Sequence, residues 1–457
     1  MKNTTLTSGH IPSQLFSMTY PMIGGILSIM SMNIVDMYYI AKLGTEPLAA
    51  MSFTMPVVAV LLSLAFGIGI GASSVISRAI GAKQHILVQA YTTNALIIAL
   101  VIACIFALCG YIWMDELFLK LGAPLTLMPK IHEFMDIWFL GSFVVVIPMV
   151  GNSAIRAAGN TKLPGLVMLS VAIVNLVLDP ILIFGLLGFP ELGLAGAAIA
   201  TVISYGFAFF FGLYFLIYKF DFINFTACFS RFISSWQAIL RIAIPATGTN
   251  LIAPLSVAIT TWFVAKNSPE AVAGFGVASR IESIFLVIIM GLSSIMGPFV
   301  GQNWGAKKYD RVFHGIDISL RFIIYWGIFT TVFLWLFSGV LTSLFSDDPN
   351  VIRSASHYLT ILPVSYLFLG AIMLISSSAN GMGTPVPSLI MSFMRLIGLY
   401  VPFIFIFLAF MDVSGVYLAA SLANIFVGIG AFIWYKRIKS HHLTEEKLSR
   451  GVYVKEK

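Results

Sequence analysis

The chain has 457 residues; 59% of them are hydrophobic, only 10% are charged, and the formal net charge is +7. Soluble proteins carry about 25% charged residues, so this composition excludes an ordinary globular protein and indicates an integral membrane protein. Because the basic residues are spread over loops and the tail, the positive charge gives no reason to expect nucleic acid as a partner.

Apolar segments long enough to cross a bilayer, which takes roughly 20 residues, recur along the whole sequence. The first begins near Leu15 and is followed by no typical cleavage site, so we expect it to remain as a membrane helix. The sequence predicts an all-α integral membrane protein with twelve transmembrane helices, at about residues 15–40, 48–76, 87–113, 133–157, 163–188, 194–218, 238–264, 271–300, 314–345, 354–379, 387–410 and 414–435.

The two halves of the chain repeat one another. Pro21 and Pro245 are 245 − 21 = 224 residues apart. The same offset aligns further positions: Gly67 with Gly291, Gly81-Ala82-Lys83 with Gly305-Ala306-Lys307, and Gly159 with Gly383. Since each half contains an even number of spans, both halves enter the membrane from the same side, as parallel repeats do. The pattern therefore predicts two pseudo-symmetric lobes of six helices each.

The predicted domain boundaries follow from this repeat and from the polar stretch in its middle. We expect a first lobe at residues 1–220, a cytoplasmic linker at 221–236, a second lobe at 237–436 and a cytoplasmic tail at 437–457.

Lysine and arginine gather in the loops on one side of this arrangement, which in membrane proteins is the cytoplasmic side. Both termini are therefore expected in the cytoplasm. The basic residues on that side are Lys2, Arg78, Lys83, Lys162, Lys219, Arg231, Lys307, Lys308, Arg311, Lys436, Arg437 and Lys439; the other side has Lys42, Lys120, Lys130, Lys266 and Arg353.

One amide and one carboxylate interrupt the fifth predicted span. Asn175 and Asp179 are four residues apart, so on a helix they share a face, and Pro180 directly after them removes a backbone donor. An ionisable group at that depth is costly and is usually tolerated where it faces the bundle interior and has a function. The alternative is a polar pair that only joins helices, as asparagine can do.

A second carboxylate, Asp36, lies toward the end of the first predicted span. It is either an interfacial acid near Lys42 or an acid that faces the lobe interior, close to Asn175 and Asp179. Burial disfavours the charged form of an acid, and a neighbouring carboxylate disfavours it further. Such a pair suits a proton-coupled carrier, although the same oxygens could hold Na⁺ instead.

The repeat shows that these acids belong to the first half alone, because Asp36 aligns with Thr260 and Asp179 with Phe403 at the offset of 224. Duplication of a structural scaffold does not require them, which favours a specialised role.

Other intramembrane polar residues give weaker signals. Asn152 and Thr201 are candidates either for the same site or for helix packing, and Pro21 is a candidate bend in the helix that carries Asp36. The remaining intramembrane charges, which we expect mainly to pair with other helices, are Arg280, Glu282 and Arg395.

The sequence contains no pattern that indicates an enzyme. No histidines have a metal-ligand spacing and no His-Glu-x-x-His motif occurs, so neither a metal nor a cofactor is expected. The glycines of Gly67-Ile-Gly-Ile-Gly-Ala72 lie inside an apolar span with no Lys-Ser/Thr after them, which indicates close helix packing rather than phosphate binding.

Over nearly its whole length the chain resembles the multidrug and toxic compound extrusion (MATE) family, and is similar to its DinF-like subgroup. The residues that carry the resemblance are Pro21 with Asp36 and Tyr38-Tyr39 in the first span, Arg156 to Asn160, Asn175-x-x-x-Asp179-Pro180, and the paired loops at Lys83 and Lys307.

The resemblance implies that Asp36 and Asp179 are protonatable coupling acids. It also implies that Asn175, Asn152 and Thr201 are hydrogen-bonding or cation-ligating neighbours, and that Pro21 is the bend. The NorM-like subgroup has further acids in its seventh and tenth helices; here residues 238–264 and 354–379 contain none.

These observations predict a secondary antiporter of the bacterial inner membrane, expected to be a monomer. It would export small organic molecules, cationic or amphipathic, in exchange for H⁺ or Na⁺, by alternating access of two lobes. One alternative is a flippase for lipid-linked oligosaccharides, which should present several basic residues to its cavity; only Arg280 and Arg395 are available. A non-transporting scaffold or receptor would leave the first-half acids unexplained.

Overall fold

The computed structural model describes residues 6–266 and 268–449, which contain helices and no strand. In this part of the chain, 12 helical segments are long and apolar enough to cross a membrane, which confirms the predicted fold class. Those of the first half are α1 (Ile11–Lys42), α2 (Thr45–Gly81), α3 (His85–Ile112), α5 with a short 3₁₀ turn before it (Leu125–Ala157), α6 (Lys162–Phe184) and α7 with a π-helical end (Gly193–Lys219).

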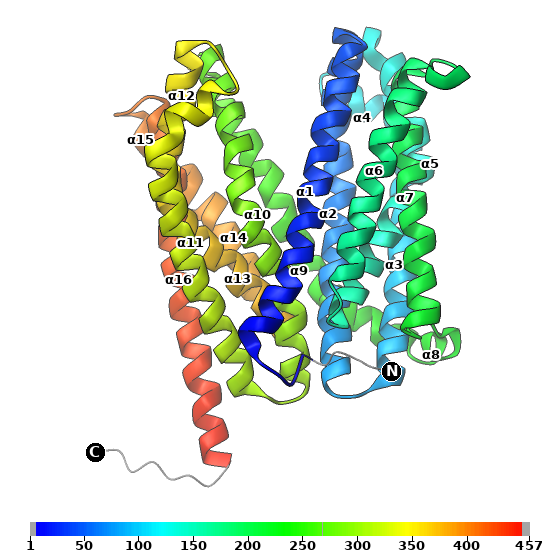
Figure 1. Cartoon of the computed structure of the whole chain (residues 1–457), viewed down its shortest axis with the longest axis vertical. Coiled ribbons are helices and arrows are strands. Elements are labelled where there is room, and N and C mark those ends of the chain that lie inside the picture. The colour runs from blue at the N-terminus through cyan, green and yellow to red at the C-terminus, as the bar shows by residue number, and fades with distance from the viewer. Residues whose placement is uncertain (1–5, 267, 450–457) are drawn as a thin grey trace. The chain divides into compact units, whose positions relative to one another are not determined.

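The spans of the second half include three that are interrupted or extended. They are α9 (Phe232–Ala265), α10 (Pro269–Gly305), α11 (Tyr309–Ser343), α12 to α13 (Pro349–Met382), α14 to α15 (Val386–Leu408) and α16, which runs from Val413 to Ser449. The 3₁₀ turn η4 (Leu362–Ser365) separates α12 from α13, and the π-helix η5 (Met394–Tyr400) separates α14 from α15. Two short helices, α4 (Met114–Lys120) and α8 (Phe225–Ser230), lie in the connections (Figure 1).

The helices pack into two compact units, each with its own apolar core. Residues 20–251 form the first unit, and residues 252–449 together with 6–19 form the second. The helices α1 and α9 therefore contribute to both units. The predicted linker at 221–236 contains α8 and the first turn of α9, and the first half of α9 packs with the first unit through Ile239, Ile242 and Ala243.

The start of α1 is held in the second unit by polar contacts with α10 and α11. The backbone N–H of Leu6 donates to Oε1 of Gln302 at 2.9 Å. Arg311 donates from Nη1 to the carbonyl oxygen of Gly9 at 2.7 Å and from Nη2 to Oε1 of Gln14 at 2.6 Å. These contacts hold the segment before α1 and the first turn of α1 in the second unit, whereas the helix from Tyr20 onward belongs to the first unit.

The glycine run of α2 packs closely against its neighbours, as the sequence predicts. A Cβ atom added to Gly71 would lie 2.7 Å from the carbonyl oxygen of Ile239 on α9, and one added to Gly69 would lie 2.6 Å from Oγ of Ser153 on α5. Only residues without a large side chain let helices approach this closely, which is how membrane helices gain packing contacts.

The repeat of the sequence is also present in the backbone. Lys83 and Lys307, which are 224 residues apart, both adopt left-handed conformations, with φ of 59° and 57°. Gly159 and Gly383, related by the same offset, have φ of 82° and 89°. A non-glycine residue rarely adopts a positive φ. Its presence at both Lys83 and Lys307 therefore shows that the corresponding loops of the two halves have the same backbone conformation.

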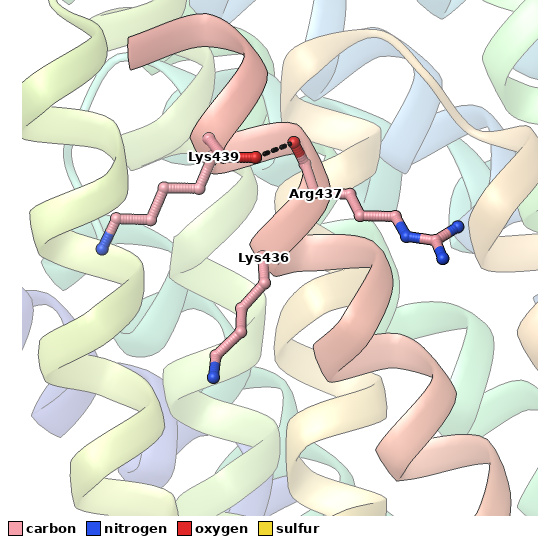
Figure 2. A pocket seen from close by; sticks show the side chains of 4 residues that line it. Lys436, Arg437 and Lys439 are labelled. Carbon is pink, nitrogen blue, oxygen red and sulfur yellow. Dashed lines mark hydrogen bonds between the residues drawn. The ribbon is translucent and has the colours of Figure 1, made fainter. Parts of the chain in front are cut away.

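Both ends of the described chain lie at the same end of the second unit. The carbonyl oxygen of Leu6 accepts from Nδ2 of Asn303 at 3.2 Å, and the ring of His442 lies 4.9 Å from that of Trp304. Basic residues of α16 gather here as well, and their side chains point away from one another (Figure 2). Of these, Lys439 pairs with Asp317 at 2.5 Å.

Gly165 on α6 provides a test of how closely α1 must approach its neighbour. A Cβ atom at this position would lie 2.5 Å from the carbonyl oxygen of Pro21, so Gly165→Ala should force α1 and α6 apart. Overpacking of this kind costs about 1–3 kcal/mol. We expect a lower melting temperature of the purified protein in detergent.

Gly24→Ala on α1 is the matched control, because no atom lies within 4 Å of its added Cβ. Equal melting temperatures for the two variants would contradict this account of the α1–α6 contact.

Candidate functional site

The helix α6 places Asn175 and Asp179 on one inward face. Both side chains are buried, at 0% and 1% exposure, and Nδ2 of Asn175 donates to Oδ1 of Asp179 at 3.2 Å. Pro180 stays within the helix, which ends at Phe184 before a left-handed Gly185. Since proline has no N–H, the ladder of α6 lacks one hydrogen bond directly beside the acid.

The helix α1 brings Asp36 to the same place. Asp36 and Asp179 are direct electrostatic neighbours. Met32 and Ile40, four residues before and after Asp36, are both buried, so Asp36 lies on the packed face of α1. The inward-facing geometry considered from the sequence is therefore the one that the structure adopts.

The cluster contains several oxygen atoms with no partner. Among the described residues, Oδ1 of Asp36, Oδ2 of Asp179 and Oδ1 of Asn175 are buried without a hydrogen bond. The ion pairs of the described residues include neither Asp36 nor Asp179, so no lysine or arginine in this part of the chain neutralises either acid.

Leaving buried polar groups unsatisfied costs free energy, and leaving buried charges unpaired costs more. A proton shared between the carboxyl groups would remove charge and add a hydrogen-bond donor. A monovalent cation would instead be ligated by these oxygens, which are the hard ligands that such ions prefer. The arrangement is thus suited to binding and releasing a small cation.

The two weaker sequence candidates lie on neighbouring helices of the same unit, α5 and α7. Asn152 is buried and its Oδ1 also has no partner among the described residues. Thr201 is half-buried. In the described chain neither is hydrogen-bonded to the acids, whereas α5 and α7 both pack against α6. Pro21 lies in the continuous helix α1, at the beginning of its portion in the first unit.

Sequence reasoning did not find Tyr205. This residue of α7 is an electrostatic neighbour of Asp36 and packs on the apolar cluster formed by Met32, Val167, Val171, Ala172 and Ala208. Its position four residues after Thr201, and hence on the same helix face, was the signal that could have identified it.

The three intramembrane charges that the sequence set apart belong to the second unit. Arg280 is exposed, whereas Glu282 and Arg395 line a cavity within that unit. Within the described residues, no group of three or more His, Cys, Asp or Glu side chains is placed to hold a metal ion.

Repeated six-helix halves that cross the membrane, with an ionisable pair inside one of them, are features of a multi-pass membrane transporter. The MatE family model matches residues 21–181 and 245–406. The chain belongs to this family, the MATE transporters, whose members are transporters and not enzymes.

Similar proteins agree over nearly the full length. A protein of Shewanella oneidensis named "FAD transporter" is 36% identical over 434 residues, covering 95% of this chain and 96% of that protein. The probable multidrug resistance protein YoeA of Bacillus subtilis is 27% identical over 86% of this chain and 88% of its own. The crystal structure of the Vibrio cholerae MATE transporter VcmN in the bent form is 31% identical, covers 94% of this chain and 98% of that one, and has a TM-score of 0.89.

Asn175 allows a test of the cluster that leaves both acids in place. Asn175→Ala removes the donor to Oδ1 of Asp179. Loss of a buried hydrogen bond to a charged group costs about 1.5–3 kcal/mol, so we expect transport of a fluorescent substrate to fall by about tenfold or more. Initial efflux rates from proteoliposomes would measure this.

Asn33→Ala on α1 is the control, because Asn33 is exposed. Equal rates for the two variants would show that Asn175 does not support the acids.

Proposed function

We propose that this protein is a secondary active antiporter that expels small organic compounds, cationic or amphipathic, in exchange for H⁺. The observation that carries the proposal is the acid pair of Asp36 and Asp179, which has buried unpartnered oxygens and no basic partner among the described residues. Uptake of H⁺ would provide a hydrogen-bond donor for the buried oxygens. Its release would leave these oxygens without a partner again, so that the site would bind another H⁺. Na⁺ could serve the same oxygens instead.

The proposed coupling acts through α1, because this helix carries Asp36 and contributes to both units. The division between the units falls between Thr19 and Tyr20, directly before Pro21. A proline weakens a membrane helix locally and permits a bend. We infer that binding of the coupling ion changes the bend at Pro21. The bend would then favour a conformation in which the substrate pathway is open to only one side of the membrane. The proposal is supported by the existence of a bent form of the Vibrio cholerae MATE transporter VcmN, which is 31% identical to this chain.

We infer that the protein functions as a monomer in the bacterial inner membrane with both termini in the cytoplasm. The excess of lysine and arginine in the loops on one side supports this orientation. The position of Leu6 and His442 at one end of the second unit agrees with an even number of spans.

Replacement of either acid by its amide tests the coupling. Asp36→Asn and Asp179→Asn keep size and polarity but cannot take up a proton, so we expect both to abolish gradient-driven efflux of a fluorescent cation from proteoliposomes. The measurement is made under an imposed pH gradient and, separately, under an imposed Na⁺ gradient.

Glu46→Gln is the control, since Glu46 is an exposed acid at the start of α2. Transport driven by the pH gradient alone assigns H⁺, and transport driven by Na⁺ alone assigns Na⁺. Undiminished efflux by both acid variants would refute the proposed role of the pair.

A second candidate for the exported compound is a flavin dinucleotide. It is favoured by the 36% identity, over 95% of this chain, to the protein named "FAD transporter". The flippase alternative has less support, because Arg280 is exposed and only Arg395 of the two arginines considered lines a cavity.

The second candidate predicts that cells producing the protein release more FAD than cells producing Asp36→Asn. Flavins in the medium can be separated by chromatography and measured by their fluorescence, with cell lysis monitored in parallel. Equal extracellular FAD in the two cultures would exclude FAD as a compound exported through this coupling site.

A further inference from the structure

The second unit contains a partly open cavity of about 210 Å³ whose lining mixes aromatic and polar residues. Tyr358, Tyr400 and Tyr417 contribute rings that are each less than 5% exposed. Glu282 on α10 and Arg395 on η5 contribute the charged groups. All of these residues belong to one unit, so the cavity does not depend on how the units are arranged.

The carboxylate of the cavity already has a partner. The hydroxyl of Tyr358 donates to Oε2 of Glu282 at 2.5 Å, and Tyr366 is a further electrostatic neighbour of Glu282. Glu282 therefore does not depend on Arg395 for a hydrogen bond.

The guanidinium of Arg395, by contrast, has N–H groups that are not used in hydrogen bonds with the described residues. Among the described residues its hydrogen bond is from Nη1 to Oδ1 of Asn424 at 3.5 Å, the outer limit for such a bond. It forms no ion pair in the described chain, although Glu282 attracts it electrostatically. A guanidinium has five N–H donors in a planar fork that matches carboxylate and phosphate oxygens. Asn424 is itself held by donation to Oγ of Ser365 at 3.0 Å.

The backbone is irregular where it borders this cavity. Arg395 and Tyr400 lie in the π-helix η5, and Leu362 lies in the 3₁₀ turn η4. π-Helical segments occur frequently at functional sites. Departures from the α-helix at membrane depth are tolerated where they are buried in protein or line a cavity.

The repeat relates this cavity to the acid site of the first unit. Thr260, which lines the cavity, is the counterpart of Asp36 at 36 + 224. Arg395 is the counterpart of Val171 at 171 + 224, and Val171 belongs to the apolar cluster beside Asp36. The two halves thus carry sites of different charge at corresponding positions.

We propose that the cavity around Arg395 is a binding subsite for an organic anion that bears a planar aromatic ring. The guanidinium would bind the carboxylate or phosphate of the ligand, and the tyrosine rings would pack against its aromatic part. The proposal rests on the proposed export of organic compounds and adds a recognition site for the anionic part of a substrate.

The test compares two flavins that share one ring system. Flavin mononucleotide carries a phosphate and riboflavin does not, and the fluorescence of both reports binding to the purified full-length protein in nanodiscs. We expect flavin mononucleotide to bind more tightly than riboflavin. Arg395→Gln should weaken flavin mononucleotide binding by about 10- to 100-fold, as loss of a charge-assisted hydrogen bond predicts, and should leave riboflavin binding unchanged.

Two further variants separate recognition from misfolding. Arg280→Gln removes an exposed arginine and should change neither affinity. Glu282→Gln can still accept from Tyr358 but removes the negative charge beside Arg395, so it should strengthen flavin mononucleotide binding, which a folding defect would not do.

Competition with inorganic phosphate and with benzoate distinguishes a phosphate site from a carboxylate site. The proposal is overturned if flavin mononucleotide shows no saturable binding, or if Arg395→Gln leaves its affinity unchanged. The Asp36→Asn variant keeps the two proposals distinguishable, because it should lose coupled transport while it still binds flavin mononucleotide.

Discussion

The main electrostatic constraint within the first unit is a pair of neighbouring carboxyl groups that have no basic partner among the described residues. Asp36 and Asp179 are neighbours on different helices, and the surroundings are apolar. A pair of this kind is costly in a membrane, so the site is most stable when it holds a proton or a cation. The same cost that makes the cluster a poor structural element is the physical basis for the proposal that its occupancy influences conformation.

The helix α1 links the acid site to both units. The segment before α1 and its first turn are hydrogen-bonded to α11 through Arg311 and to α10 through Gln302, whereas the contact of Gly25 with Gly165 fixes a later turn against α6. The helix α9 is divided in the opposite order: its first half packs with the first unit, and its second half belongs to the second unit. A change at Asp36 is therefore made on an element that already belongs to both units.

The sequence predicted the helices and the shared face of Asn175 and Asp179 because both depend on simple local rules. Hydrophobic length determined the 12 spans, and the four-residue spacing of Asn175 and Asp179 placed them on one face. The division at α1 and α9 was not predictable, since it arises from tertiary contacts such as Gly71 with Ile239. Tyr205 and the cavity at Arg395 were missed for the same reason: their neighbours come from distant helices.

The difference between the two halves is more informative than their likeness. Duplication preserved the loop conformation at Lys83 and Lys307, which is a matter of backbone geometry. It did not preserve charge, because Asp36 corresponds to Thr260 and Arg395 to Val171. If both halves had only a structural role, nothing would oppose the replacement of these costly groups by apolar ones. Their presence on opposite halves supports the two proposals together, in which one half serves the coupling ion and the other a group of opposite charge.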